Sequence, residues 1–191
     1  MGKYEHLWSM LEEDLPAPYF AAFMDNINLI PDEEPVKAYL QGLSALHANQ
    51  HIQAIDSFRD LACQEPSFIN PKLYHVLASL EANIMRGTLD GYYREFFIYQ
   101  LNFVQSPQIE SFVMAYQGLQ NIWNKQKLTG IEQCKKAEVL GGNFYPTLYL
   151  IARAYSNIGD YKSFNIHFER LVQLCPRIAK IKRETFIGSL L

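Results

Sequence analysis

The sequence lacks the patterns that mark several large classes of protein. Charged residues make up only 19% and the net charge is −3, so there is no basic excess to neutralise the phosphates of a nucleic acid. No apolar run approaches the ~20 residues of a membrane-spanning helix. The opening stretch, MGKYEHLWSMLEEDL, is too acidic and too interrupted for a signal peptide. We therefore expect neither a nucleic-acid partner nor a membrane span.

Cysteine is scarce as well. The three cysteines, Cys63, Cys134 and Cys175, are scattered, and each lies beside apolar residues in a helical pattern. An odd number of cysteines without a signal peptide favours reduced thiols. Each one is interpreted as a small apolar residue at a packed or partly packed position, since none has a nucleophile motif around it. This composition predicts a cytoplasmic protein.

Motifs for catalysis are missing too. His47 and His51 are one helical turn apart, but no third metal ligand lies near them in the sequence. The segment Gly141-Gly142-Asn143 lacks the Lys-Ser/Thr of a phosphate loop and is better explained as a helix end. No triad, zinc motif or dinucleotide fingerprint is present. The sequence therefore predicts a protein that is not an enzyme and that binds no cofactor or metal.

What the sequence does contain is apolar residues at helical spacing. In the segment 149–176, apolar residues recur every three or four positions on both sides of Gly159-Asp160, and Pro176 follows the second run. Glycine accepts the positive φ of a helix end, and aspartate caps the helix that follows. This pattern predicts a helical hairpin of about 30 residues.

The hairpin pattern recurs along the chain. Four positions, the first of them always small, are separated by 12, 4 and 8 residues in three copies: Gly42, Ala54, Phe58 and Pro66; Gly118, Gly130, Cys134 and Gly142; Ala152, Phe164, Phe168 and Pro176. A fourth copy has Ala78 at the small position. It contains about six extra residues, which we place in the loop near 86–90. The small positions predict close crossings of the two helices in each hairpin.

This unit resembles the tetratricopeptide repeat, and the resemblance covers residues 34–176. It departs from the family at Phe164, where the family prefers alanine. The resemblance implies an all-α fold, an α-α superhelix of about four helical hairpins. Residues 1–33 read as N-terminal helices, which are a candidate degenerate repeat, and 177–191 as a C-terminal capping helix. A basic cluster in 177–191 leaves a membrane-surface helix open as an alternative.

The resemblance also implies a binding surface, because the first helix of each such repeat lines a concave groove. The positions that carry this expectation are Tyr39, Leu43, Lys72, His75, Phe112, Leu119, Tyr149 and Arg153. A family variant grips a carboxylate with polar side chains at such positions, but here only Lys72 and Arg153 are cationic. An apolar groove suits an extended or helical peptide with hydrophobic anchors. The alternative is that these aromatic residues pack between repeats.

Two functions follow from this reading. The first is a non-catalytic adaptor or chaperone that binds a peptide segment of a partner protein, similar in size and groove character to the secretion chaperones of bacteria. The second is a structural subunit that assembles with copies of itself into a larger complex, through Trp8, Phe20, Phe23 or the end around Phe186.

Overall fold

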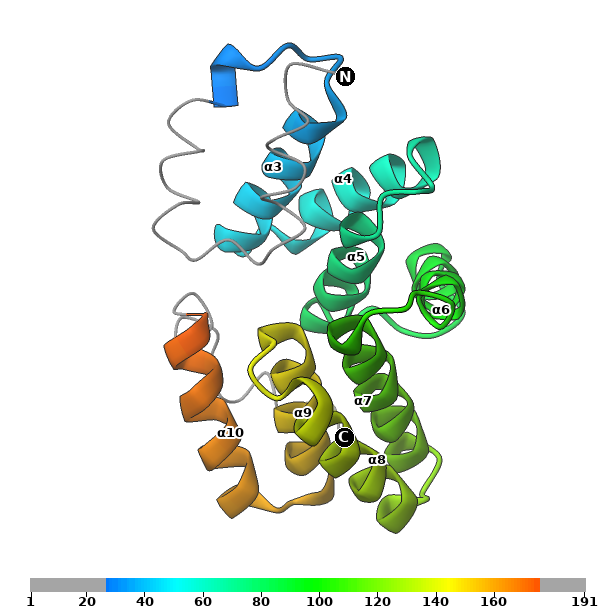
Figure 1. Cartoon of the computed structure of the whole chain (residues 1–191), viewed down its shortest axis with the longest axis vertical. Coiled ribbons are helices and arrows are strands. Elements are labelled where there is room, and N and C mark those ends of the chain that lie inside the picture. The colour runs from blue at the N-terminus through cyan, green and yellow to red at the C-terminus, as the bar shows by residue number, and fades with distance from the viewer. Residues whose placement is uncertain (1–26, 176–191) are drawn as a thin grey trace. The chain divides into compact units, whose positions relative to one another are not determined.

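The computed structural model describes residues 27–175. Within these residues it contains a short 3-10 helix, eight α-helices and no strand (Figure 1). The elements are η1 (Ile27–Leu29), α3 (Pro35–His47), α4 (His51–Gln64), α5 (Asn70–Glu81), α6 (Leu89–Leu101), α7 (Pro107–Trp123), α8 (Lys127–Gly141), α9 (Tyr145–Ile158) and α10 (Tyr161–Leu174).

The first helix of each hairpin begins and ends in the same way. A proline stands in the first turn of α3, α5, α7 and α9, where its missing N–H is no loss. A residue with positive φ follows the end of each of these helices, namely Asn49, Asn83, Lys125 and Gly159. This left-handed conformation stops the helix and reverses the chain. The same local signals therefore define four consecutive hairpins.

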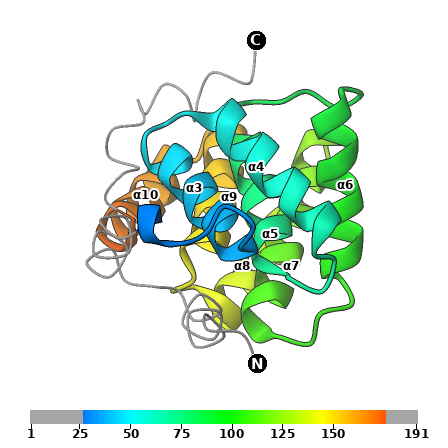
Figure 2. The same ribbon diagram turned by 90° about the horizontal axis from the view of Figure 1, so that it is seen from above.

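The chain divides into two compact units, Met1–Tyr99 and Gln100–Leu191. In the first unit α3 packs on α4, and α4 packs on α5 (Figure 1). In the second unit α7 packs on α8 and α9, α8 packs on α9, and α9 packs on α10 (Figure 2). A buried hydroxyl pair, Ser111 and Thr147 at 2.9 Å, joins α7 to α9.

The predicted small positions lie at close helix crossings. Gly42, Ala78, Gly118 and Ala152 are all buried. A Cβ atom built on Gly42 would lie 2.6 Å from the Phe58 ring, and one on Gly118 would lie 2.8 Å from Cys134 Sγ. Phe58 and Cys134 occupy the same position in the predicted repeat. The spacing therefore predicted the register of these hairpins correctly.

The last hairpin follows the sequence prediction closely. Gly159 adopts φ 79° after α9, and the Asp160 side chain accepts a hydrogen bond from Ser163 N at 3.1 Å as the cap of α10. Phe164, at the position where the family prefers alanine, is buried beside Phe168 with ring centroids 5.4 Å apart. The large side chain is thus accommodated within the packing of this hairpin.

The second hairpin, α5 and α6, departs from the others. Its two helices are joined by the long connection 82–88, close to where the sequence predicts an insertion. α6 runs across α5 instead of alongside it (Figures 1 and 2). The contact is made by bulky rings, with the centroids of His75 and Phe97 5.0 Å apart. A long loop and large side chains at the contact explain why this pair is not closely antiparallel.

Successive helical hairpins confirm the predicted all-α fold and are consistent with an α-α superhelical arrangement. Of the predicted terminal segments, residues 1–26 and 177–191 lie outside the described residues.

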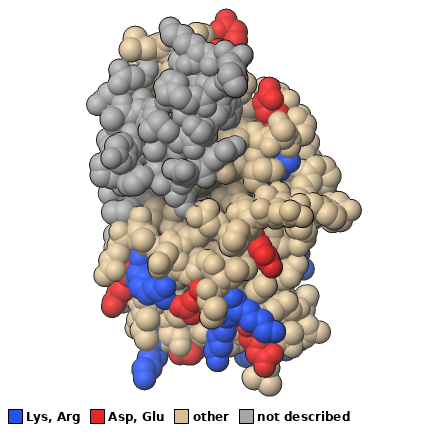
Figure 3. All heavy atoms as spheres, viewed as in Figure 1, with Lys and Arg blue, Asp and Glu red and all other residues tan. Residues whose placement is uncertain are grey.

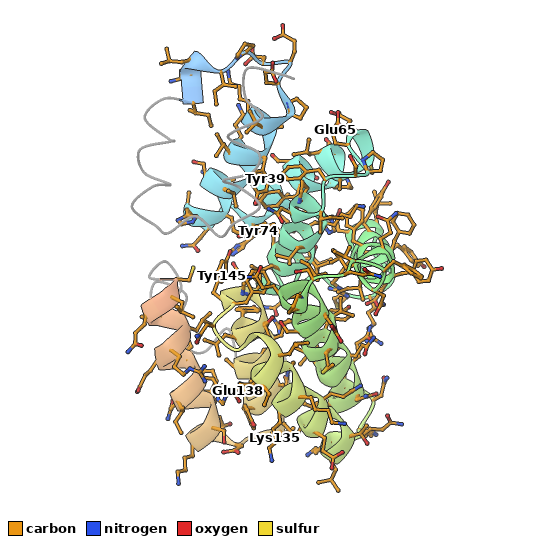
Figure 4. All side chains as sticks on the ribbon, in the orientation of Figure 1. Tyr39, Glu65, Tyr74, Lys135, Glu138 and Tyr145 are labelled. Carbon is orange, nitrogen blue, oxygen red and sulfur yellow. The ribbon has the colours of Figure 1, made fainter. Side chains whose placement is uncertain are left out.

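An ion-pair cluster connects α8 to α10. Glu138 lies 3.2 Å from His167 Nε2 and accepts a hydrogen bond from Arg170, which also donates to the Gly142 carbonyl (Figure 4). Burial favours a raised pKa for Glu138, but hydrogen bonds and charge from His167 and Arg170 outweigh it, so the pKa is lowered. The stabilisation is therefore present above the ordinary carboxyl pKa and is lost as the pH falls through the lowered value.

We expect Glu138→Gln to lower the free energy of unfolding by about 1 kcal/mol at neutral pH, because the amide carries no charge for these partners. The difference from the original chain should shrink as the pH falls through the lowered pKa of Glu138, where this carboxylate itself becomes protonated. Urea unfolding at several pH values measures both effects. Glu132→Gln, at an exposed position of the same helix, is the control, and an equal loss in both variants at neutral pH would contradict the assignment.

Candidate interaction surface

All eight predicted groove residues are buried, with exposed fractions between 0% and 8%. They come from four helices: Tyr39 and Leu43 from α3, Lys72 and His75 from α5, Phe112 and Leu119 from α7, and Tyr149 and Arg153 from α9. Each is the first helix of its hairpin, as the sequence predicts. Their surroundings show what each side chain does within its own unit.

Tyr39 is the centre of an aromatic cluster in the first unit. Its ring centroid lies 5.1 Å from that of Phe68, 6.0 Å from that of Phe58 and 6.0 Å from that of Tyr74 (Figure 4). These rings come from α3, α4, α5 and the connection before α5. Edge-to-face contacts of this kind stabilise a packed core. Tyr39 therefore holds the first two hairpins together.

The two polar residues on α5 are also used within the chain. Lys72 Nζ donates a hydrogen bond to the Pro66 carbonyl at 2.6 Å, and burial lowers the pKa of this lysine. His75 is fully buried between the rings of Tyr93 and Phe97. Neither side chain is presented as a cation to a partner's carboxylate. The contacts of Lys72 and His75 favour the prediction that the chain has no carboxylate clamp, which stays a prediction.

In the second unit, the predicted residues again have contacts inside the chain. Phe112 and Leu119 are fully buried in α7. Arg153 Nη1 donates a hydrogen bond to the Tyr149 hydroxyl at 3.1 Å, one turn apart on α9. Their burial is compatible with the alternative that these side chains pack between repeats, which stays a prediction. That they bind a peptide stays a prediction.

Among the described helices, α6 has the largest number of exposed large apolar side chains. Leu89, Tyr92, Phe96 and Tyr99, which we call the outer row, are 65%, 67%, 50% and 63% exposed. Their spacing of three, four and three residues places them on one helix face. The surface at the position of α6 in Figure 3 is formed by uncharged side chains, and Figure 4 shows rings of this helix extending outward.

Polar anchors fix the opposite face of α6. Arg94, almost fully buried, donates a hydrogen bond from Nη1 to the Ile84 carbonyl at 2.8 Å. Asp90 accepts one from Arg59 Nη1 on α4, also at 2.8 Å. Phe97 and Ile98 are buried on this inner side. These contacts determine which face of α6 is buried, and they leave the outer row facing solvent.

Sequence reasoning missed the outer row, although a signal was present. The segment LDGYYREFFIYQL is apolar on two sides of a helix, which is more than one packed face requires. The inner set and the outer row are both spaced as helix faces. The contacts of Arg94 and Asp90 with residues outside the helix, together with the ring contact between Phe97 and His75, show which side lies inside.

A separate cleft of about 670 Å3 lies at the start of α7, in the second unit. Its apolar lining is formed by Phe103, Val104, Pro107, Val113 and Met114. Glu110 is the one acidic or basic side chain among its lining residues. Within this lining, Glu110 has no second acidic or basic side chain beside it to act as an acid–base partner.

Within the described part of the chain, His47 and His51 belong to no cluster of metal-ligating side chains. His51 Nε2 lies 3.2 Å from Glu81 Oε2. Across residues 27–175, no group of three or more His, Cys, Asp or Glu side chains is placed to hold a metal ion. In the same range, no helix is long and apolar enough to cross a membrane.

Comparisons with protein-family models, curated proteins and solved structures found no match.

Proposed function

We propose that the protein is a non-catalytic protein-binding module, an adaptor or a chaperone, built from tetratricopeptide-like hairpins. Its place of action is the cytoplasm, where its cysteines stay reduced. The observation that supports this proposal most strongly is the outer row of α6. Contiguous apolar surface of a few hundred Å2 on a soluble protein marks an interaction site, and four large side chains, each at least half exposed, provide such a surface.

The sequence prediction placed the binding site among the first helices of the hairpins. Tyr39 and Tyr149 there are almost fully buried, and truncating a large buried side chain costs about 3–5 kcal/mol of stability. Replacing both by alanine would therefore test folding before it tested binding. Substitutions in the exposed outer row leave the core intact, so they probe binding directly.

A photo-crosslinking amino acid at position 96 of the full chain tests this proposal. In lysate of the source cells, we expect it to capture a discrete protein, because the side chain at this position lies at the centre of the exposed row. An excess of the original chain should compete with the capture, and Tyr92→Glu/Phe96→Glu should not. The crosslinker at the exposed position 139 of α8 is the control.

Two comparisons decide whether α6 is an interaction surface: crosslinking at position 96 against position 139, and competition by the original chain against the doubly substituted chain. If positions 96 and 139 capture the same proteins, or if the doubly substituted chain competes as well as the original chain, α6 is not an interaction surface. The proposed function would then lose its main support.

A further inference from the structure

The outer row has the spacing of a helix-pairing seam. Leu89, Tyr92, Phe96 and Tyr99 repeat in the three-four pattern by which two helices interdigitate side chains along their length. Among the described residues of the first unit, each side chain of the outer row is at least half exposed, so this side of α6 is open to a second helix. A second helix with apolar residues at the same spacing is therefore the partner that fits.

Resting on the proposed function, we propose that this second helix is α6 of another copy of the same chain. The row is symmetric about its centre. In an antiparallel pair, Leu89 faces Tyr99 of the second copy, and Tyr92 faces Phe96 of the second copy. A two-fold axis then makes each contact twice, as in the self-complementary interfaces of most dimers.

The available area matches a small dimer interface. Large apolar and aromatic side chains bury about 150–250 Å2 each when fully covered. Four of them, half to two-thirds exposed, offer roughly 500 Å2 per copy, or about 1,000 Å2 for two copies. This is the lower end of what specific interfaces bury. Met85, 73% exposed just before α6, adds to the surface.

The charges around the row favour an uncharged partner. Asp90 is paired with Arg59 at 2.8 Å. Glu95, beside the row, lies 3.9 Å from Arg86 Nε and 3.7 Å from Arg94 Nε. The acidic groups are thus compensated inside their own chain, so that two copies approach without repulsion between like charges. A strongly acidic or basic peptide would find no complementary charge here.

Sedimentation equilibrium of the purified full chain, up to about 100 µM, tests the inference. We expect a monomer–dimer equilibrium in the micromolar range or tighter. Tyr92→Glu/Phe96→Glu should weaken it about tenfold or more, because carboxylates would be buried in an apolar seam. Leu128→Glu/Val139→Glu adds the same charge at positions of α8 that are 85% and 91% exposed, and should leave the equilibrium unchanged.

The antiparallel geometry makes a sharper prediction. Tyr92→Glu and Phe96→Lys chains should each pair poorly with themselves but should pair in a mixture, because the introduced carboxylate then faces the introduced ammonium group. Failure of the mixture to recover pairing would overturn the antiparallel register.

The remaining outcomes separate this inference from the proposed function. A chain that stays monomeric at every concentration, or that dimerises equally well as Tyr92→Glu/Phe96→Glu, overturns self-association through α6. If position 96 nevertheless crosslinks a different protein, the proposed function stands and the second copy is the wrong partner. If position 96 captures nothing specific either, both proposals fail.

Discussion

Replacing Gly118 by leucine is expected to destabilise the fold by about 3 kcal/mol or more, toward the upper end of overpacking effects. A Cβ atom at Gly118 would lie 2.8 Å from Cys134 Sγ and 2.8 Å from the Gly130 carbonyl oxygen. The second contact is with backbone, which cannot move aside by a change of rotamer. α7 and α8 would therefore have to separate along their whole crossing. For a chain of this size, the loss corresponds to roughly 6–12 °C in Tm.

Thermal unfolding followed by circular dichroism measures this effect. Gly118→Ala should already be destabilising, since its single methyl group meets the same two atoms. Gln117→Ala, at the neighbouring and partly exposed position of α7, should change stability by no more than about 0.5 kcal/mol. An unchanged Tm in Gly118→Leu would mean that α7 and α8 do not cross at this residue.

The helix crossings were predictable because they depend on local sequence. A small residue, a partner twelve or sixteen positions later and a turn between them are all present in one hairpin. Gly159 and Asp160 were recognised in the same way. Asn49, Asn83 and Lys125 end the other first helices with positive φ, but lysine is an uncommon residue in that conformation. The repeat, more than the residue type, determines where those helices stop.

The candidate surface was harder to predict, because it depends on contacts between distant segments. The repeat pattern indicated which face of α3 and α9 to consider, but it did not show that Tyr39 and Tyr149 would be covered. On α6, two apolar faces compete for burial. The hydrogen bonds of Arg94 and Asp90 to residues outside the helix decide between them, and periodicity alone contains no such information.

His75 shows the same dependence on long-range contacts, and it leads to the second large effect. Its side chain is fully buried beside the rings of Tyr93 and Phe97. Burial, and then the positive charges of Arg59 and Arg94, lower its pKa from 6.5 to about 3. Asp90, which lies 3.9 Å from His75 Nε2, is shared with Arg59 and does not offset this. The folded chain therefore keeps His75 neutral in mildly acidic solution.

The unfolded chain, by contrast, protonates this histidine below pH 6.5, so protons bind the unfolded state more strongly. His75 thus contributes stability that is fully present above pH 6.5 and is lost as the pH falls toward 3. Well below pH 6.5 the loss is about 1.4 kcal/mol per pH unit, which gives about 2 kcal/mol between pH 6.5 and 4.5 and about 5 kcal/mol over the whole range. An effect of this size is comparable to the total stability of many small domains.

We expect His75→Gln to remove this part of the acid sensitivity, because glutamine does not titrate. Urea unfolding at pH 6.5 and 4.5 should show a smaller loss in the variant than in the original chain, by about 2 kcal/mol. Carboxylates titrate alike in both chains and cancel in the comparison. His47→Gln, at an exposed position at the end of α3, should retain the full loss. An equal loss of stability in His75→Gln and in the original chain would contradict this account. It would mean that His75 accepts a proton in the folded state despite its buried, positively charged surroundings.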